Sequence, residues 1–153
     1  MKAVRRDWIV PALALLGLAD ALYLAVLHWQ GEVPPCHGYA GCAQVNTSPY
    51  AEIFGVPVAA LGAALYATVL GIAVWRPQTR GVAFAQTTLL LYSLILAGAL
   101  FMAYLTAIEA FVLQAYCYWC LGLATINLLL LVLVSRELWL IGGRPARYQV
   151  GRA

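Results

Sequence analysis

Charged residues are scarce in this chain. Asp, Glu, Lys and Arg make up 10% of its 153 residues, while 64% are hydrophobic. A typical soluble domain is about 25% charged, and a soluble domain of this size leaves much of its surface in water. The composition therefore excludes an ordinary soluble globular domain and indicates a protein that lies mostly in lipid.

Lysine and arginine are absent from two stretches, residues 30–56 and 109–116. The nine basic residues lie elsewhere: Lys2, Arg5, Arg6, Arg76, Arg80, Arg136, Arg144, Arg147 and Arg152. Cytoplasmic loops of membrane proteins carry the excess of basic residues. We therefore expect both termini and the loop 76–82 in the cytoplasm, and the two stretches on the outer side of the cell (inner) membrane. No basic face exists outside these flanks, so the net charge of +3 does not indicate nucleic-acid binding.

Four long apolar segments account for the composition. They cover about residues 8–29, 57–75, 83–112 and 117–141, and each is long enough for a spanning helix, which needs roughly 20 residues. Tryptophans stand near the segment ends, as at membrane interfaces: Trp8, Trp29, Trp75, Trp119 and Trp139. The first apolar run is too long for a cleaved signal peptide. The sequence therefore predicts one all-α domain over residues 1–153, a bundle of four transmembrane helices.

The one long connection, residues 30–56, contains a helix signal of its own. Ser48 can cap a short helix that begins at Pro49, and Gly55 can end it. Apolar residues recur at helical spacing within this piece: Tyr50, Ile53 and Phe54. We expect a short outer-surface helix here, resting on the membrane or over the end of the bundle.

Cysteine is also rare, and the chain has four: Cys36, Cys42, Cys117 and Cys120. The distribution of Lys and Arg alone puts all four on the outer side, where disulfides persist. Cys117 and Cys120 stand three residues apart at a helix start, and a disulfide between them would constrain the unfolded chain little. A helix N-terminus favours the reactive thiolate. The spacing therefore favours redox chemistry over a structural role.

Depth in the membrane predicts a direction of electron flow. If the last helix enters from the outer side, Cys120 lies roughly 4–5 Å deeper than Cys117, at 1.5 Å per residue. We expect Cys120 to face an acceptor in lipid and Cys117 to face the loop. Cys36 and Cys42 can take electrons from a soluble partner and exchange with Cys117. A quinone is a suitable lipid-soluble acceptor of two electrons, and no motif indicates a bound flavin, haem or nucleotide.

Two alternatives stay open at this point. The four cysteines can form structural disulfides, in any of three pairings, in a membrane protein that is not an enzyme, such as a chaperone or assembly factor. They can also bind one zinc ion as four thiolates, with His37 beside Cys36. The zinc site is disfavoured because the two pairs come from different loops and Cys120 lies inside an apolar segment.

Four other polar residues have simpler interpretations. Asp20 lies well inside the first segment, and an acid within a membrane is a functional candidate by default. It can assist proton transfer to a reduced quinone or hydrogen-bond a neighbouring helix. Glu109, at the outer end of the third segment, is expected to be an interfacial charge. His28 is expected to be an ordinary residue at the loop edge, as is His37.

The chain resembles the vitamin K epoxide reductase family in its prokaryotic form. The matching stretches are "GLADALYLAVLHW", the pair Cys36/Cys42, "VNTSPYAEIFGVPVAALGAALY" and "FMAYLTAIEAFVLQAYCYWC", and together they extend over essentially the whole chain. The resemblance implies a four-helix bundle around a quinone of the menaquinone or ubiquinone type, with the outer loop and its short helix as a lid.

The resemblance also implies a role for each cysteine. Cys117 and Cys120 are then the active-site pair, with Cys120 in contact with the quinone. Cys36 and Cys42 relay electrons from a thioredoxin-fold thiol oxidase on the outer face. Because many prokaryotic members carry such a domain fused and this chain stops at Ala153, we expect the partner to be a separate protein. The implied function is a membrane thiol oxidoreductase that supports disulfide formation in exported proteins.

The quinone contacts depart from those of animal family members. Ser48 matches the serine that follows the second loop cysteine in prokaryotic members, and with Asp20 it is our candidate for binding the quinone. Ala51 stands where animal members carry a quinone-contacting asparagine. Ala124 stands where they carry a tyrosine.

Overall fold

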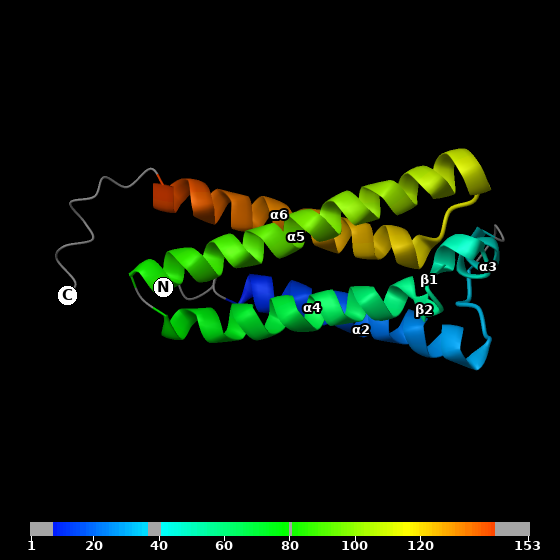
Figure 1. Cartoon of the computed structure of the whole chain (residues 1–153), viewed down its shortest axis with the longest axis horizontal. Helices are drawn as coiled ribbons and strands as arrows, with labels where there is room; N and C mark the ends of the chain where they lie inside the picture. Colours follow the sequence, from blue (N-terminus) through cyan, green and yellow to red (C-terminus); the bar gives the residue numbers. More distant parts are fainter. Residues whose placement is uncertain (1–7, 37–40, 80, 143–153) are drawn as a thin grey trace.

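A computed structural model describes residues 8–36, 41–79 and 81–142 (Figure 1). Its main elements are four long helices: α2 (Ile9–Gln30), α4 (Val58–Trp75), α5 (Val82–Ile108) and α6 (Tyr118–Gly142). Each is long and apolar enough to cross a membrane. The structure confirms the predicted all-α bundle of four helices, and the helix bounds lie within a few residues of those expected.

The helices run up and down along one long axis, with α2 beside α4 and α5 beside α6 (Figure 1). Short connections join α4 to α5 at one end of the bundle. The segments 31–57 and 109–117, and with them all four cysteines, lie at the other end, which we call the cysteine end. The charge pattern predicted that these two segments share one side, because neither contains Lys or Arg.

Tyr66 of α4 connects three of the helices. A Cβ added to Gly17 of α2 would lie 2.6 Å from Cδ1 of Tyr66, so the ring packs directly on the bare backbone of α2. The Tyr66 hydroxyl donates a hydrogen bond of 2.9 Å to the carbonyl of Leu123 in α6. Small residues of this kind let helices approach closely in lipid, where packing replaces the hydrophobic effect as the main attraction.

The long connection at the cysteine end differs from the expected form. Its helix is α3 (Gly41–Asn46), which precedes the predicted position. Pro49 does begin a helical turn, but this 3-10 turn, η1 (Pro49–Ala51), ends after three residues. Ser48 occupies the N-cap position, yet its hydroxyl donates to the carbonyl of Val45 at 2.8 Å and does not cap the turn.

A hairpin replaces the rest of the predicted helix. Strand β1 (Glu52–Ile53) pairs with β2 (Val56–Pro57) in an antiparallel register that sets Ile53 opposite Val56. Phe54 and Gly55 form the turn, with φ of 53° and 77°. Two successive left-handed residues are the requirement of a type I′ hairpin. Gly55 therefore serves a strand-to-strand turn, and the helix prediction over 48–55 is wrong from Glu52 onward.

At the opposite end of the bundle, a buried ion pair fastens α4 to α6. Arg76, in the 3-10 turn η2 (Arg76–Gln78), donates to Glu137 of α6 at 2.6 Å. The two side chains are 9% and 13% exposed. The Arg76 guanidinium also lies 5.2 Å from the ring centre of Phe84 in α5. One cation thus contacts both helices that follow α4.

We expect Glu137→Gln to destabilise the chain by about 2 kcal/mol, because a buried guanidinium loses its charged acceptor. Thermal unfolding of the purified protein in detergent measures the change. The double variant Arg76→Met with Glu137→Leu removes both charges and should be less destabilised than Glu137→Gln. A single variant as stable as the unchanged chain would contradict this role for the ion pair.

Candidate functional site

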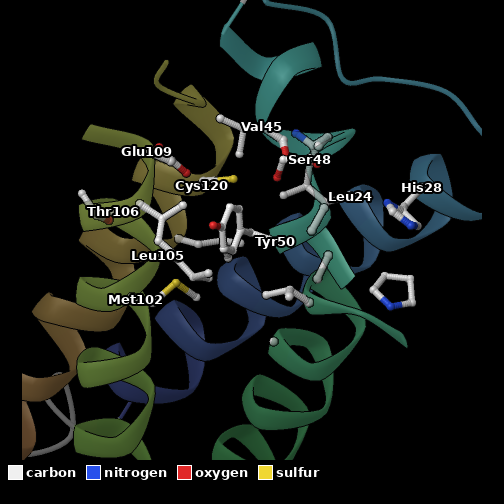
Figure 2. A pocket seen from close by; sticks show the side chains of 18 of the residues that line it. Leu24, His28, Val45, Ser48, Tyr50, Met102, Leu105, Thr106, Glu109 and Cys120 are labelled. Atoms are coloured by element: carbon white, nitrogen blue, oxygen red, sulfur yellow. The ribbon is translucent and has the colours of Figure 1, made fainter. Parts of the chain in front are cut away.

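A cavity opens at the cysteine end of the bundle (Figure 2). Its deeper wall is aliphatic and comes from α2, α5 and α6, with Leu24, Met102, Leu105 and Leu123 among the lining residues. The loop segment covers it from the other side through Val45, Asn46, Ser48, Tyr50 and Ala51. An apolar pocket with a few polar groups at one end is the usual form of a small-molecule site.

The inner cysteine pair stands at the start of α6. Cys120 is half-buried and lines the cavity, whereas Cys117 is fully buried and lies outside its lining. The Cys117 carbonyl accepts the amide N–H of Leu121 at 2.9 Å, so the first turn of α6 holds the two residues in place. Both sulfurs are free thiols in this structure.

The outer pair forms a disulfide. The Cα atoms of Cys36 and Cys42 are 6.1 Å apart, within the range that such bonds span. Cys42, on α3, is 1% exposed, whereas Cys36 is half-buried. The indole N–H of Trp119 donates to the carbonyl of Pro35 at 3.2 Å, which fixes the residue before Cys36 against α6. Cys36 is therefore the more accessible sulfur of this pair.

Asn46 connects the two cysteine pairs and was missed from the sequence. Its amide nitrogen donates to the Cys42 carbonyl at 2.9 Å and to the Cys117 sulfur at 3.6 Å. Gln44, on the same helix, donates to the carbonyl of Leu113 at 3.0 Å. Helix α3 is thus fastened to the chain just before α6. No sequence signal foretold this, because the contact joins residues about 70 positions apart.

The Cys117 thiol is prepared for exchange. A hydrogen bond from the Cys120 thiol is the main cause that lowers the pKa of Cys117 to about 7. Burial opposes this shift, while the Cys120 amide and the Asn46 side chain add to it. The ordinary value for a thiol is about 8.5. The lowered pKa increases the thiolate fraction of Cys117, which favours thiol–disulfide exchange at this sulfur.

Glu109 lies in a different place from the one predicted. It was expected as an interfacial charge, but its side chain is 4% exposed and lines the cavity. It begins a π-helical turn, η3 (Glu109–Leu113), that follows α5. Its carboxylate accepts the amide N–H of Cys117 at 3.3 Å, and its side chain lies beside Cys120 (Figure 2). Single π-helical turns are frequent at functional sites.

The remaining predicted residues divide between the cavity and its surroundings. Ser48 and Ala51 line the cavity, but Asp20 does not. Asp20 faces α6 at Gly122, where an added Cβ would lie 3.6 Å from Oδ2, and its Oδ1 is buried without a hydrogen-bond partner. His28 was expected to be an ordinary residue at the loop edge. In the structure it lines the cavity and contacts Glu52 Oε1 at 2.8 Å.

The four cysteines do not form a zinc site of four thiolates in this structure. Cys36 and Cys42 are bonded to each other, which leaves two free thiols. Within residues 8–36, 41–79 and 81–142, no three His, Cys, Asp or Glu side chains gather as metal ligands. His37, which the zinc hypothesis included, lies outside the described residues.

Comparison with known proteins agrees with this arrangement. The sequence profile of the vitamin K epoxide reductase family matches residues 8–135, a range that includes all four cysteines and most of the four long helices. Among curated proteins, none matches the chain. The profile match extends over far more than half of the sequence and confirms the resemblance drawn from the cysteine pattern. The chain belongs to the vitamin K epoxide reductase family.

Proposed function

We propose that this membrane thiol oxidoreductase is a quinone-dependent thiol oxidase. In this proposal it takes electrons from a thioredoxin-fold protein and passes them through two cysteine pairs to a quinone, so that exported proteins acquire disulfides. One observation carries the proposal: Cys120 lines an apolar cavity, while Cys117 lies against the loop helix that holds Cys42. The two pairs thus lie between a solvent-facing loop and a cavity within the bundle.

Burial favours an order for the relay. Cys36 is the more accessible sulfur, so the partner's thiolate attacks it and Cys42 leaves as a thiolate. A second partner thiol releases the mixed disulfide. With the inner pair oxidised, the Cys42 thiolate then attacks Cys117, and Cys120 leaves. Attack by Cys36 on Cys42 restores the outer disulfide and leaves the inner pair as thiols, which is the state of the structure described above.

The cavity suits a quinone in the chemistry of its lining. Leu24, Met102, Leu105 and Leu123 would hold the apolar ring, and Ser48 and Tyr50 bring hydroxyl groups to its polar edge. A quinone of the ubiquinone or menaquinone type supplies the capacity to accept two electrons and two protons. Ala51 leaves room at the position where animal members carry an asparagine.

The orientation in the membrane follows from charge. Arg76, in η2 between α4 and α5, lies at the end opposite the cysteines, and the loop residues 30–36 and 41–56 contain no Lys or Arg. By the positive-inside rule, we propose that the cysteine end faces the outer side of the inner membrane and that both termini are cytoplasmic. A thioredoxin-fold partner in that compartment would reach Cys36.

Thiol labelling tests the proposed function. Purified chain is reduced, then exposed to a ubiquinone or menaquinone analogue, and its free thiols are counted with an alkylating mass tag before and after. The proposal expects a loss of free thiols on addition of quinone and their return with reduced partner. Cysteine pairs that never change state would favour structural disulfides.

We expect Cys42→Ser, incubated with the oxidised thioredoxin-fold partner, to accumulate a mixed disulfide with Cys36. The Cys36 thiolate attacks the partner's disulfide, and Cys42 is no longer present to displace the partner from Cys36. Non-reducing gels with mass spectrometry identify the joined peptides. Cys36→Ser is the matched control and should trap far less, since Cys42 is 1% exposed. Stronger trapping in the Cys36→Ser variant would reverse the assigned order.

A further inference from the structure

Glu109 has no part in the relay described above, yet its position is costly. The carboxylate is 4% exposed, and burial of a charge without a counterion is unfavourable. Among the described residues, the side-chain ion pairs are His28 with Glu52 and Arg76 with Glu137, and neither includes Glu109. A buried acid that accepts the amide N–H of one redox cysteine and lies beside the other indicates a chemical role.

The geometry joins this carboxylate to the sulfur that faces the cavity. Figure 2 shows Glu109 from η3 and Cys120 from α6 side by side at the rim of the cavity. The Cys117 amide holds Oε2 of Glu109 at 3.3 Å. Among the described residues that line the cavity, Glu109 is the sole carboxylate. The backbone therefore holds this carboxylate beside the sulfur that faces the cavity.

We propose that Glu109 is the proton carrier of the inner cysteine pair. It takes the thiol proton of Cys120 when that sulfur reacts and gives the proton to an oxygen of the quinone in the cavity. This inference rests on the proposed function for the identity of the final acceptor. The first half, removal of the Cys120 proton, concerns only side chains of this chain.

The step balances in atoms and electrons. Two thiols lose two electrons and two protons, and one S–S bond forms between Cys117 and Cys120. The same two electrons and two protons convert quinone to hydroquinone. The S–H bond of Cys120 breaks as an O–H bond forms on Glu109, and that O–H bond breaks when the proton moves on. Cys117 releases its proton to water, and water supplies one proton to the second oxygen of the quinone.

Other titratable groups near this site are few. His28 and Tyr50 line the same cavity, and His28 is engaged by Glu52 at 2.8 Å. Cys117 does not line the cavity. Asp20 is the other carboxyl close to Cys120, but it faces Gly122 and does not line the cavity. Glu109 is thus the acid that touches both the reacting sulfur and the cavity.

The test measures how the alkylation rate of Cys120 depends on pH, in the absence of quinone. Full-length chain with both inner thiols reduced is alkylated by a small maleimide, and mass spectrometry follows Cys120 alone. In the unchanged chain, the alkylation rate of Cys120 should stop rising with pH once Glu109 is fully ionised. Glu109 then accepts the thiol proton in every molecule, so a further rise in pH adds no more base. In Glu109→Gln, which keeps an oxygen for the Cys117 amide, the rate should keep rising about tenfold per pH unit.

Three further variants make the outcome decisive. Glu109→Asp keeps a carboxylate and should restore the plateau, and it serves if Glu109→Gln does not fold. Glu32→Gln removes an exposed acid from the same end and should match the unchanged chain. A lost plateau in Asp20→Asn, with Glu109→Gln unaltered, would move the role to Asp20. Superimposable profiles for Glu109→Gln and the unchanged chain would overturn the proposal.

Catalysis gives the second readout. If Glu109 passes the proton on, Glu109→Gln should lower kcat for quinone reduction about 100-fold, the usual scale of general acid–base catalysis, and leave KM nearly unchanged. A change in KM alone would overturn the role in proton delivery. If the unchanged chain reduces no quinone but the Cys120 plateau depends on Glu109, the proposed function fails while the proton transfer from Cys120 stands.

Discussion

Replacing Cys120 with serine should abolish quinone reduction, whichever reductant is supplied. Cys120 is the cysteine that lines the cavity within the described part of the chain. A serine hydroxyl cannot form the S–S bond that releases two electrons, so the loss should be on the order of 10⁴-fold or more, as for other essential nucleophiles. Quinol formation by purified chain in lipid nanodiscs, followed by absorbance, measures the effect.

A second cysteine variant provides the control. With a small dithiol as reductant, Cys36→Ser should still reduce quinone, because the dithiol can reach the inner pair without the outer disulfide. The same variant should lose reduction driven by a thioredoxin-fold partner. Retained quinone reduction in Cys120→Ser would contradict the place of Cys120 as the last sulfur before the acceptor.

The second large effect concerns Gly41, the first residue of α3. A Cβ at this position would collide with the backbone carbonyl oxygen of Tyr116 and lie 2.9 Å from its amide nitrogen. Backbone atoms cannot rotate away as a side chain can. In Gly41→Ala, α3 must therefore withdraw from the segment before Cys117 and take Cys42 and Asn46 with it. We expect partner-driven quinone reduction to fall about 100-fold, the cost of a displacement near 1 Å.

The two reductants separate this effect from general damage. Gly41→Ala should lose far less activity with a small dithiol, because the dithiol reduces the inner pair without the outer disulfide. The main cause of the lowered pKa of Cys117 is Cys120, and Asn46 of α3 contributes less. Gly71→Ala is the matched control, since an added Cβ there meets nothing within 4 Å. Equal partner-driven activity in Gly41→Ala would show that α3 need not lie against Cys117. Loss of both activities would indicate collapse of the cysteine end.

The long helices could be predicted because each depends on local composition. A run of about 20 apolar residues spans a bilayer wherever it stands in the chain, and α2, α4, α5 and α6 follow those runs closely. The loop was harder because local signals competed. Ser48 and Pro49 favour a helix, but residues 52–57 satisfy their backbone groups by pairing across the Phe54–Gly55 turn.

The two residues that reasoning from sequence misplaced or missed depend on distant partners. From the sequence, Glu109 is expected to be a charge at a helix end. In the structure it begins a π-helical turn, and its carboxylate accepts the Cys117 amide inside the protein. From the sequence, Asn46 is an ordinary loop residue. In the structure its amide donates to the sulfur of Cys117, which lies 71 positions further along the chain. Neither contact has a signature in sequence spacing, because the chain returns to the site through two separate helices.

The sequence by itself determined that this protein spans a membrane with four helices, that its cysteines gather at one end, and which family it resembles. Composition, charge placement and cysteine spacing are properties of the sequence itself, so they do not depend on how the chain folds. Only the tertiary structure decided which sulfur lines the cavity, which pair is bonded, and that a buried carboxylate accepts the Cys117 amide and lies beside Cys120. Those features arise where α3, η3 and the start of α6 meet, and the packing of segments distant in sequence creates that meeting point.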